Sequence, residues 1–139
     1  MAKYFIASKW NNMKAVQLLT ENLQELGHEV FSYVSDQRNF VAQDEMDEKR
    51  LALFDNSDDW RKRDELKELF DKDLGGLTQS DICILLLPSG KGAHIQAGIG
   101  YGFNKHMVLI GELESVEIHY MVFDEWHKTI EDYLKSLKK

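Results

Sequence analysis

The sequence predicts an α/β protein in which helices cover both faces of a parallel β-sheet. Short apolar runs alternate along the chain with longer stretches whose apolar residues recur every three or four positions, which is the spacing of an amphipathic helix. The run "DICILLLP" (residues 81–88) is apolar without alternation, as is typical of a strand that is covered on both faces. Strands that alternate with helices favour parallel pairing through right-handed crossovers.

The first half of the chain predicts two strands separated by a helix. Residues 3–8 ("KYFIAS") and 28–34 ("HEVFSYV") have the composition of strands. Residues 10–27 carry apolar residues at helical spacing and end at Gly27, a natural helix stop. Residues 36–56 are mixed, rich in acids and without a clean period. We expect them to form a long loop, with a short helix at most.

The second half predicts a longer series of elements. In chain order we expect a helix over 56–77 with Ser57 or Asp58 as its N-cap, a strand over 81–88, a helix over 92–104, a strand over 106–112, a short strand within 120–126 and a helix over 125–138. With a single proline and no Gly/Ser linker, residues 1–139 are expected to form one domain.

Composition limits the classes of function. The chain has 17 basic and 24 acidic residues and a net charge of −7, and the basic residues are not clustered, so a nucleic acid polymer is not an expected partner. The longest apolar run is far too short to span a membrane. No signal peptide is evident, and the single Cys83 cannot form an internal disulfide. We therefore expect a cytoplasmic protein that does not bind membranes.

Two loops are expected at the same edge of the sheet. In open parallel sheets, ligands bind beyond the carboxyl ends of the strands, where the strand order reverses. The first and third strands are expected to be neighbours there, followed by the loops "ASKWNN" (residues 7–12) and "PSGKGAH" (residues 88–94). The binding candidates in these loops are Ser8, Lys9, Trp10, Ser89, Gly90, Gly92 and His94.

The glycine-bearing stretch matches no standard phosphate motif. "SGKGAH" lacks the first glycine of a P-loop and the Ser or Thr after its lysine. Gly98, Gly100 and Gly102 follow one turn into the helix, so we expect them chiefly to let this helix pack closely on the sheet. By contrast, Ser89, Gly90 and Gly92 suit a ligand loop, because free N–H groups at a helix N-terminus favour a phosphate or hydroxyl group.

Several other residues could take part in catalysis or binding, but for most of them the sequence favours a structural role. None of the five histidines falls in a metal-binding pattern, so neither a metal nor a cofactor is expected. Cys83 lies within an apolar strand and is expected in the core. Trp10 suits either a stacking platform for a base or a cover for the helix. Asp73 lies beside apolar Leu74, so it faces either solvent or the site.

Taken together, these residues resemble the nucleoside 2-deoxyribosyltransferase family, which includes the deoxynucleoside 5'-monophosphate N-glycosidases. The matching segments are "YFIAS", "DLGGLTQSDICILLLP", "SGKGAHIQAGIGYGFNKHMVLI" and "HYMVFDE". The resemblance spans almost the whole chain and is weakest over residues 36–60. It implies a flavodoxin-like, doubly wound, five-stranded parallel sheet with the strand order 2-1-3-4-5.

The same resemblance implies cleavage of the N-glycosidic bond of a nucleoside or nucleoside 5'-monophosphate. In such enzymes a carboxylate attacks the sugar C1' to form a glycosyl-enzyme that a second base or water resolves. The position of that nucleophile is Gln96 in this sequence, and Asp73 matches the acid that assists the leaving base. Ser8, Lys9 and Ser89 match the loops that hold a phosphate. Family members commonly form dimers whose sites borrow residues from the neighbouring subunit, so a homodimer is expected.

Gln96 is the departure from the family pattern. An amide has the shape of a carboxylate but carries no charge and is a poor nucleophile. Three explanations are compatible with the sequence: a substitution that traps substrate, a natural binder without catalysis, or transfer of the role to another acid. An alternative to the enzyme is therefore a catalytically inactive module that binds or senses a nucleotide.

Overall fold

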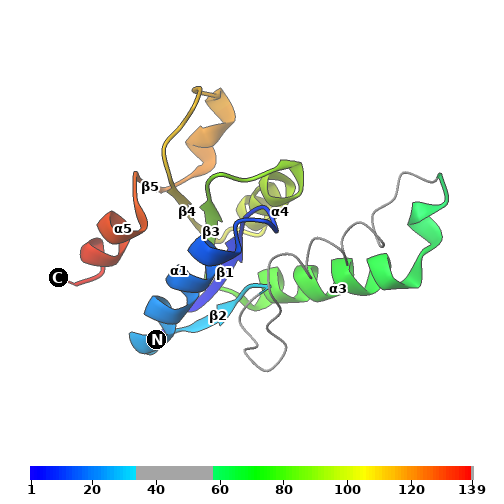
Figure 1. Cartoon of the computed structure of the whole chain (residues 1–139), viewed down its shortest axis with the longest axis horizontal. Helices are drawn as coiled ribbons and strands as arrows, with labels where there is room; N and C mark the ends of the chain where they lie inside the picture. Colours follow the sequence, from blue (N-terminus) through cyan, green and yellow to red (C-terminus); the bar gives the residue numbers. More distant parts are fainter. Residues whose placement is uncertain (34–57, 139) are drawn as a thin grey trace.

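The computed structural model describes residues 1–33 and 58–138 of the chain. In these ranges, five parallel strands form one sheet with the order β2-β1-β3-β4-β5 (Figure 1), so the expected α/β architecture and strand order are confirmed. The strands are β1 (Lys3–Ala7), β2 (Glu29–Phe31), β3 (Ile82–Leu86), β4 (His106–Ile110) and β5 (Glu125–His127). The helices are α1 (Met13–Glu25), α3 (Asp64–Gln79), α4 (Lys91–Gly102) and α5 (Ile130–Ser136), with short 3-10 helices η2 (Trp60–Lys62) and η3 (Ile118–Val122).

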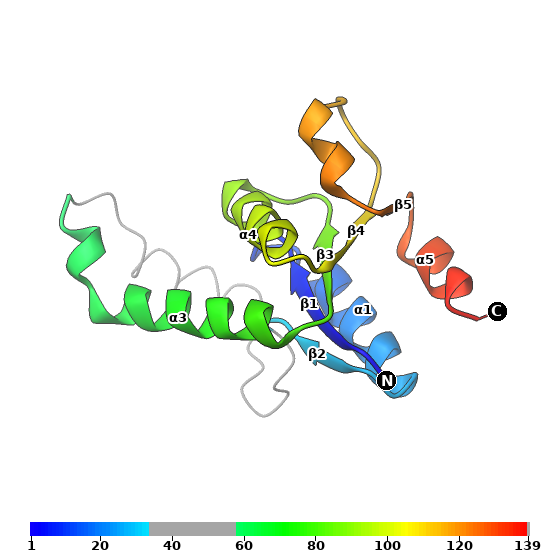
Figure 2. The same cartoon turned by 180° about the vertical axis from the view of Figure 1, so that it is seen from behind.

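Each face of the sheet has its own hydrophobic core. Side chains alternate along a strand, so Tyr4 and Ile6 of β1 point to one face and Phe5 and Ala7 to the other. The first core is completed by buried residues of α1 and α5 and the second by residues of α3 and α4. The views from the two sides show the same layering (Figures 1 and 2). The central strand β3 is buried on both faces, as its unbroken apolar run predicted.

The end of α1 follows the expected glycine rule. Gly27 adopts a φ of 90°, a left-handed conformation that a residue with a Cβ rarely adopts. The N–H of Gly27 donates to the carbonyl of Gln24 at 3.0 Å, and the N–H of His28 donates to that of Leu23 at 3.1 Å. This pair of bonds is the Schellman motif, which satisfies the last carbonyls of the helix and turns the chain into β2.

Among the described residues, helix α3 packs on the sheet through its C-terminal end. Its buried residues are Gly76 and Leu77, and the helix extends away from the sheet in both views (Figures 1 and 2). Gly76 is required for this contact, because a Cβ there would lie 2.6 Å from the ring of Phe31 in β2. Asp73 lies one turn before this anchor.

Helix α3 begins later than expected, the last strand coincides only in part with its expected stretch, and a third expectation lies outside the described residues. Helix α3 begins at Asp64 with Arg63 as its N-cap residue, so Asp58 is not the N-cap; Ser57 and the irregular stretch 36–56 belong to the undescribed part of the chain. The last strand is β5 at Glu125–His127, which follows the 3-10 helix η3 and shares Glu125 and Trp126 with the expected stretch 120–126. Asp124 sets this register, because its N–H donates to the carbonyl of Met107 at 2.9 Å and its carboxylate accepts the N–H of Met107 at 2.8 Å.

Candidate active site

The two expected loops meet at the carboxyl ends of β1 and β3. These strands are hydrogen-bonded neighbours, with Ala7 opposite Leu85. The hydroxyl of Ser8 donates to the carbonyl of Leu86 at 2.8 Å, which ties the first loop to the end of β3. The amide of Asn12 donates to the same hydroxyl at 3.0 Å. The hydroxyl hydrogen of Ser8 is thus donated to a carbonyl of the protein, and this serine holds the two loops together.

The rest of the first loop is held by Tyr33, two residues after the end of β2. The hydroxyl of Tyr33 donates to the carbonyl of Lys9 at 3.1 Å. Burial raises the pKa of the Tyr33 phenol, so this hydroxyl keeps its proton and remains a donor. Lys9 and Trp10 are half-buried in the turn that leads into α1. The alternatives for Trp10, a stacking platform or a helix cover, stay open.

The second loop leads into α4 with open space around its glycines. Gly90 is the N-cap residue of α4, and a Cβ at Gly90 or Gly92 would meet no atom within 4 Å. The imidazole of His94 connects this loop to η3. Its Nδ1 lies 2.9 Å from the carbonyl of Gly90 and 3.2 Å from the hydroxyl of Ser89, and its Nε2 lies 3.1 Å from the hydroxyl of Tyr120.

Gln96 and Asp73 form a direct pair between α4 and α3. The amide Nε2 of Gln96 donates to the Oδ2 of Asp73 at 3.0 Å. Both side chains are half-buried. His94 and Gln96 therefore leave α4 on opposite flanks, one toward η3 and the other toward α3.

The environment of Asp73 favours its neutral form. Desolvation raises the pKa of Asp73 above its ordinary value of 3.8, and the charge of Lys72 and the hydrogen bond from Gln96 offset only part of this effect. A carboxyl group with a raised pKa retains its proton to higher pH and suits the role of a general acid. The raised pKa therefore comes from burial and not from Gln96, whose hydrogen bond lowers the pKa of Asp73; a second carboxylate at position 96 would raise it further.

The three later glycines of α4 do not share one role. Gly100 is buried, and a Cβ there would lie 3.1 Å from the side chain of Cys83 in β3. The expectation of close helix packing is confirmed for Gly100. It is wrong for Gly98 and Gly102, whose added Cβ would meet no atom within 4 Å. Ala93 and Ala97 supply the rest of the small packing face.

Cys83 lies in the core, as expected. It is 0% exposed, and burial raises the pKa of its thiol to about 12. Within residues 1–33 and 58–138, no three His, Cys, Asp or Glu side chains are grouped so that they could hold a metal ion. None of the helices in those ranges is both long enough and apolar enough to cross a bilayer.

Sequence reasoning missed two residues of this edge, Tyr120 and Asn12. Tyr120 is 26 positions from its partner His94, so no local pattern reveals their contact. Asn12 lies four residues after Ser8 within the first loop. Its place in a polar turn before a helix was the available signal.

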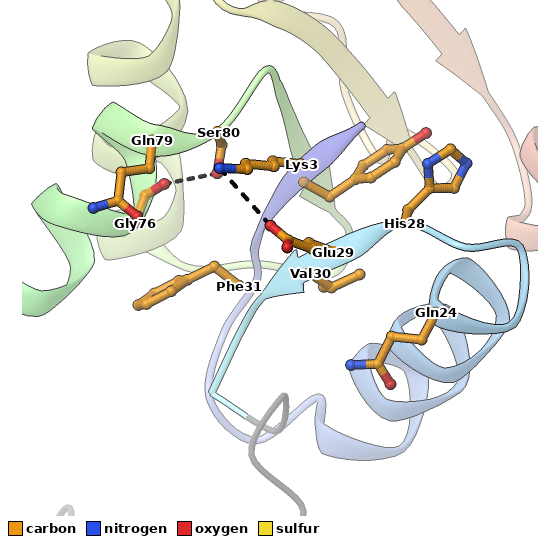
Figure 3. A pocket seen from close by; sticks show the side chains of 10 residues that line it. Lys3, Gln24, His28, Glu29, Val30, Phe31, Gly76, Gln79 and Ser80 are labelled. Atoms are coloured by element: carbon orange, nitrogen blue, oxygen red, sulfur yellow. Dashed lines mark hydrogen bonds and ion pairs between the residues drawn. The ribbon is translucent and has the colours of Figure 1, made fainter. Parts of the chain in front are cut away.

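A cavity of about 420 Å³ lies elsewhere, beside the edge strand β2 (Figure 3). Its lining comes from the start of β1, from β2, and from the C-terminal ends of α1 and α3, and it includes the ion pair between Lys3 and Glu29 at 3.9 Å. None of the candidate site residues lines this cavity. The expectation that Gln96, Asp73 and both loops share one pocket therefore stays a prediction.

Comparison with solved structures identifies the class of fold. The chain resembles the CMP N-glycosidase BcmB from Clostridium botulinum, with 18% identity, a TM-score of 0.60 and 99% of each chain covered. It also resembles the 2-deoxyribosyltransferase of Bacillus psychrosaccharolyticus, with 20% identity, a TM-score of 0.67 and coverage of 96% of this chain and 90% of that one. A conserved protein from Enterococcus faecalis V583 matches with 14% identity, a TM-score of 0.58 and coverage of 99% and 98%.

These likenesses confirm the flavodoxin-like fold that the sequence resemblance implied. They extend over nearly the whole chain, at identities that establish shared architecture and leave the chemistry to be argued from the site. No family model matches the sequence, and no curated protein matches it either.

Proposed function

We propose that this chain binds a nucleoside or nucleoside 5'-monophosphate at the carboxyl edge of β1 and β3 and slowly hydrolyses its N-glycosidic bond. The observation that carries the proposal is the contact between Gln96 and Asp73 at 3.0 Å, because these are the two positions that resemble the nucleophile and the helper acid of the deoxyribosyltransferase family. The named activities of two structural neighbours, a CMP N-glycosidase and a 2-deoxyribosyltransferase, support the substrate class.

Asp73 is the residue that drives the chemistry in this proposal. Desolvation raises its pKa, and in the proposed step the Asp73 carboxyl donates its proton to the departing base as the bond between C1' and the base nitrogen breaks. A water oxygen then bonds to C1', and the proton that this water releases returns to the Asp73 carboxylate. The products are the free base and the sugar with a hydroxyl at C1'.

Gln96 makes this route slow. Its amide orients Asp73 and can hydrogen-bond a sugar hydroxyl. It places no negative charge near C1', where positive charge develops in the transition state. A second candidate function, a nucleotide-binding or sensing module without turnover, is favoured by the same observation, since Gln96 is engaged as a donor to Asp73.

The binding step is tested by a thermal-shift screen. The 5'-monophosphates of adenosine, guanosine, cytidine, uridine and thymidine and the five free nucleosides are added at millimolar concentration. At least one compound should raise the melting temperature, since a ligand that binds only the folded state stabilises it by about 2.7 kcal/mol at 100 times its Kd. Base release measured by chromatography then separates hydrolysis from sensing. No shift with any compound would contradict both candidates.

We also propose that the chain forms a homodimer and that residues 1–139 fold as one domain. Three side chains of the segment around η3 support the dimer, because they are strongly exposed apolar groups: Val116 is 87% exposed, Ile118 68% and Met121 86%. Apolar groups gathered in this way are typical of surfaces that another chain covers.

A further inference from the structure

We propose that Tyr120 is a positioning residue that acts through His94 to turn the hydroxyl of Ser89 toward the ligand. This inference rests on the proposed function, because it assigns to the same site the donor that would recognise an oxygen of the substrate. The recognised group is an oxygen acceptor, either a phosphate oxygen of a nucleoside 5'-monophosphate or a sugar hydroxyl of a nucleoside.

The contacts of His94 define which ring nitrogen carries the hydrogen. A backbone carbonyl only accepts hydrogen bonds, so the 2.9 Å contact between Nδ1 and the carbonyl of Gly90 requires a hydrogen on Nδ1. In the neutral ring, Nε2 is then bare and accepts the hydroxyl hydrogen of Tyr120 at 3.1 Å. Tyr120 thereby stabilises the Nδ1–H tautomer of His94.

Tyr120 is held in place for this task by its own packing. Its ring lies against the rings of His94 and Phe123, with centroid separations of 5.9 and 6.2 Å. Both Tyr120 and Phe123 pack on the core formed by α3, α4 and the sheet. The hydroxyl is thus presented to Nε2 by an anchored ring rather than by an exposed side chain.

The tautomer of His94 decides the direction of the Ser89 hydroxyl. Nδ1 lies 3.2 Å from the Oγ of Ser89. If Nδ1 carries the hydrogen, Ser89 cannot donate to it, and its hydroxyl hydrogen points elsewhere. If Nδ1 were bare, Ser89 would donate to the imidazole and be lost as a ligand donor. The hydroxyl of Tyr120 in η3 therefore sets the tautomer of His94, and this tautomer sets the direction in which the Ser89 hydroxyl donates.

Of the two described loop serines at this edge, Ser89 is the one whose hydroxyl remains for a ligand. The hydroxyl of Ser8 already donates to the carbonyl of Leu86 at 2.8 Å and accepts from Asn12 at 3.0 Å. Ser89 stands beside Gly90, where an added Cβ would meet nothing within 4 Å, so an oxygen of the substrate has room to approach. The two serines of this edge therefore have different roles: Ser8 holds the loops together, and Ser89 hydrogen-bonds the ligand.

The first test needs no ligand. Histidine ring nitrogens of the ¹⁵N-labelled full chain are observed by NMR at a pH of about 8.5, above the usual titration range of imidazole. His94 should be mainly the Nδ1–H tautomer in the parent and should shift toward Nε2–H in Tyr120→Phe, which removes only the hydroxyl. Tyr101→Phe, at the exposed end of α4, is the matched control and should leave His94 unchanged. An Nε2–H parent, or no shift in Tyr120→Phe, would overturn the proposal.

The second test measures coupling in binding. Calorimetry with the five 5'-monophosphates and their nucleosides compares the parent with Ser89→Ala, Tyr120→Phe and the double variant. Each single variant should weaken binding roughly three- to tenfold, the worth of one hydrogen bond, and the double variant should be no weaker than Ser89→Ala. Weakening only with monophosphates assigns the acceptor to phosphate, and equal weakening with nucleosides assigns it to the sugar.

Independent, multiplying losses in the double variant would mean that Tyr120 acts only through the structure of η3, and would overturn the proposal. The outcome also separates the two proposals. If the parent binds none of the ten compounds while the NMR result holds, the proposed function fails and the tautomer relay stands. If binding is seen without the tautomer shift, the relay fails and the proposed function stands.

Discussion

At the scale of single residues, the proposed chemistry depends on the interaction between Asp73 and Gln96. Glutamine at position 96 gives Asp73 a hydrogen-bond donor at 3.0 Å, where glutamate would place a second negative charge. Desolvation still dominates and raises the pKa of Asp73. The ionised form of Asp73 is therefore less stable in the folded chain than in the unfolded chain. This difference lowers the free energy of unfolding at a pH where Asp73 is ionised.

This cost predicts a specific pH dependence for Asp73→Asn. Both states of the parent bind the Asp73 proton below pH 3.8, its ordinary pKa. As pH rises above that value the unfolded chain releases the proton first, so the parent loses stability until the raised folded-state pKa is passed. The asparagine variant lacks this loss. Its free energy of unfolding should gain on the parent from about pH 4 upward, by less than about 1 kcal/mol because the site is half-exposed.

Urea unfolding curves at a series of pH values measure this difference. Asp71→Asn, an exposed acid on the same helix, is the matched control and should show little pH-dependent gain. A difference between the Asp73→Asn variant and the parent that stays constant, or that shrinks as pH rises, would show that Asp73 does not carry a raised pKa.

At the scale of elements, the orientation of α3 depends on one glycine. Gly76 lets the helix approach β2, and a Cβ at that position would lie 2.6 Å from the Phe31 ring. Gly76 and Leu77 are the buried residues of α3, so we expect this contact to contribute to where Asp73 lies relative to Gln96.

Gly76→Ala should destabilise the chain by roughly 1–3 kcal/mol, the usual cost of overpacking. Gly75→Ala is the matched control, since its Cβ would meet nothing within 4 Å. The control should be neutral or more stable by up to about 1 kcal/mol, through the better helix propensity of alanine. Denaturant unfolding of the two variants decides the matter, and equal stabilities would contradict the proposed role of Gly76.

Local patterns predicted those elements whose determinants are themselves local. The unbroken apolar run of β3 and the stop at Gly27 were both found from the sequence, and both depend on neighbouring residues. The last strand was predicted to lie within 120–126 but occupies only the end of that stretch, because residues 120–122 belong to η3 and Asp124 bonds to Met107 on β4. A contact between residues that are far apart in the sequence cannot be predicted from the local sequence pattern.

In the candidate site, too, features with local determinants were predicted and features set by distant contacts were not. Ser8 and Ser89 were expected at the edge from the topology alone, and the structure brings their loops together. Their different hydrogen bonds could not be foreseen, since these depend on Leu86, Asn12 and a histidine held by Tyr120. Gly98 was assigned to packing by its spacing, but spacing does not tell which side of the helix faces the sheet.

At the scale of the whole molecule, the sheet separates two cores, and the two candidate loops meet at the carboxyl ends of β1 and β3. The cavity of Figure 3 lies elsewhere, beside β2. The segment around η3 projects from the sheet beyond β4 (Figures 1 and 2) and exposes Val116, Ile118 and Met121. This exposure is the basis for expecting an assembly larger than one chain.

Sedimentation velocity at about 50 µM, a concentration at which a micromolar dimer is largely formed, should give a dimer or higher assembly. Met121→Lys should shift the distribution toward monomer, because it places a charge on the apolar surface. Leu18→Lys, at an exposed apolar position on α1, is the control and should leave the assembly unchanged. A monomeric parent at this concentration would contradict the proposed dimer.

The central claim, that this edge is an N-glycosidase site with its nucleophile replaced by an amide, is tested most directly by Gln96→Glu. Base release from the ten nucleosides and monophosphates is followed by chromatography for the parent, for Gln96→Glu and for Gln24→Glu, which makes the same change at an exposed position on α1. Gln96→Glu should release base about 100-fold faster than the parent, the scale of one well-placed charge-stabilising group. It should also gain a pH optimum, because two carboxyl groups about 3 Å apart share a proton. Gln24→Glu should match the parent. A folded Gln96→Glu variant that releases base no faster than the parent would contradict the account.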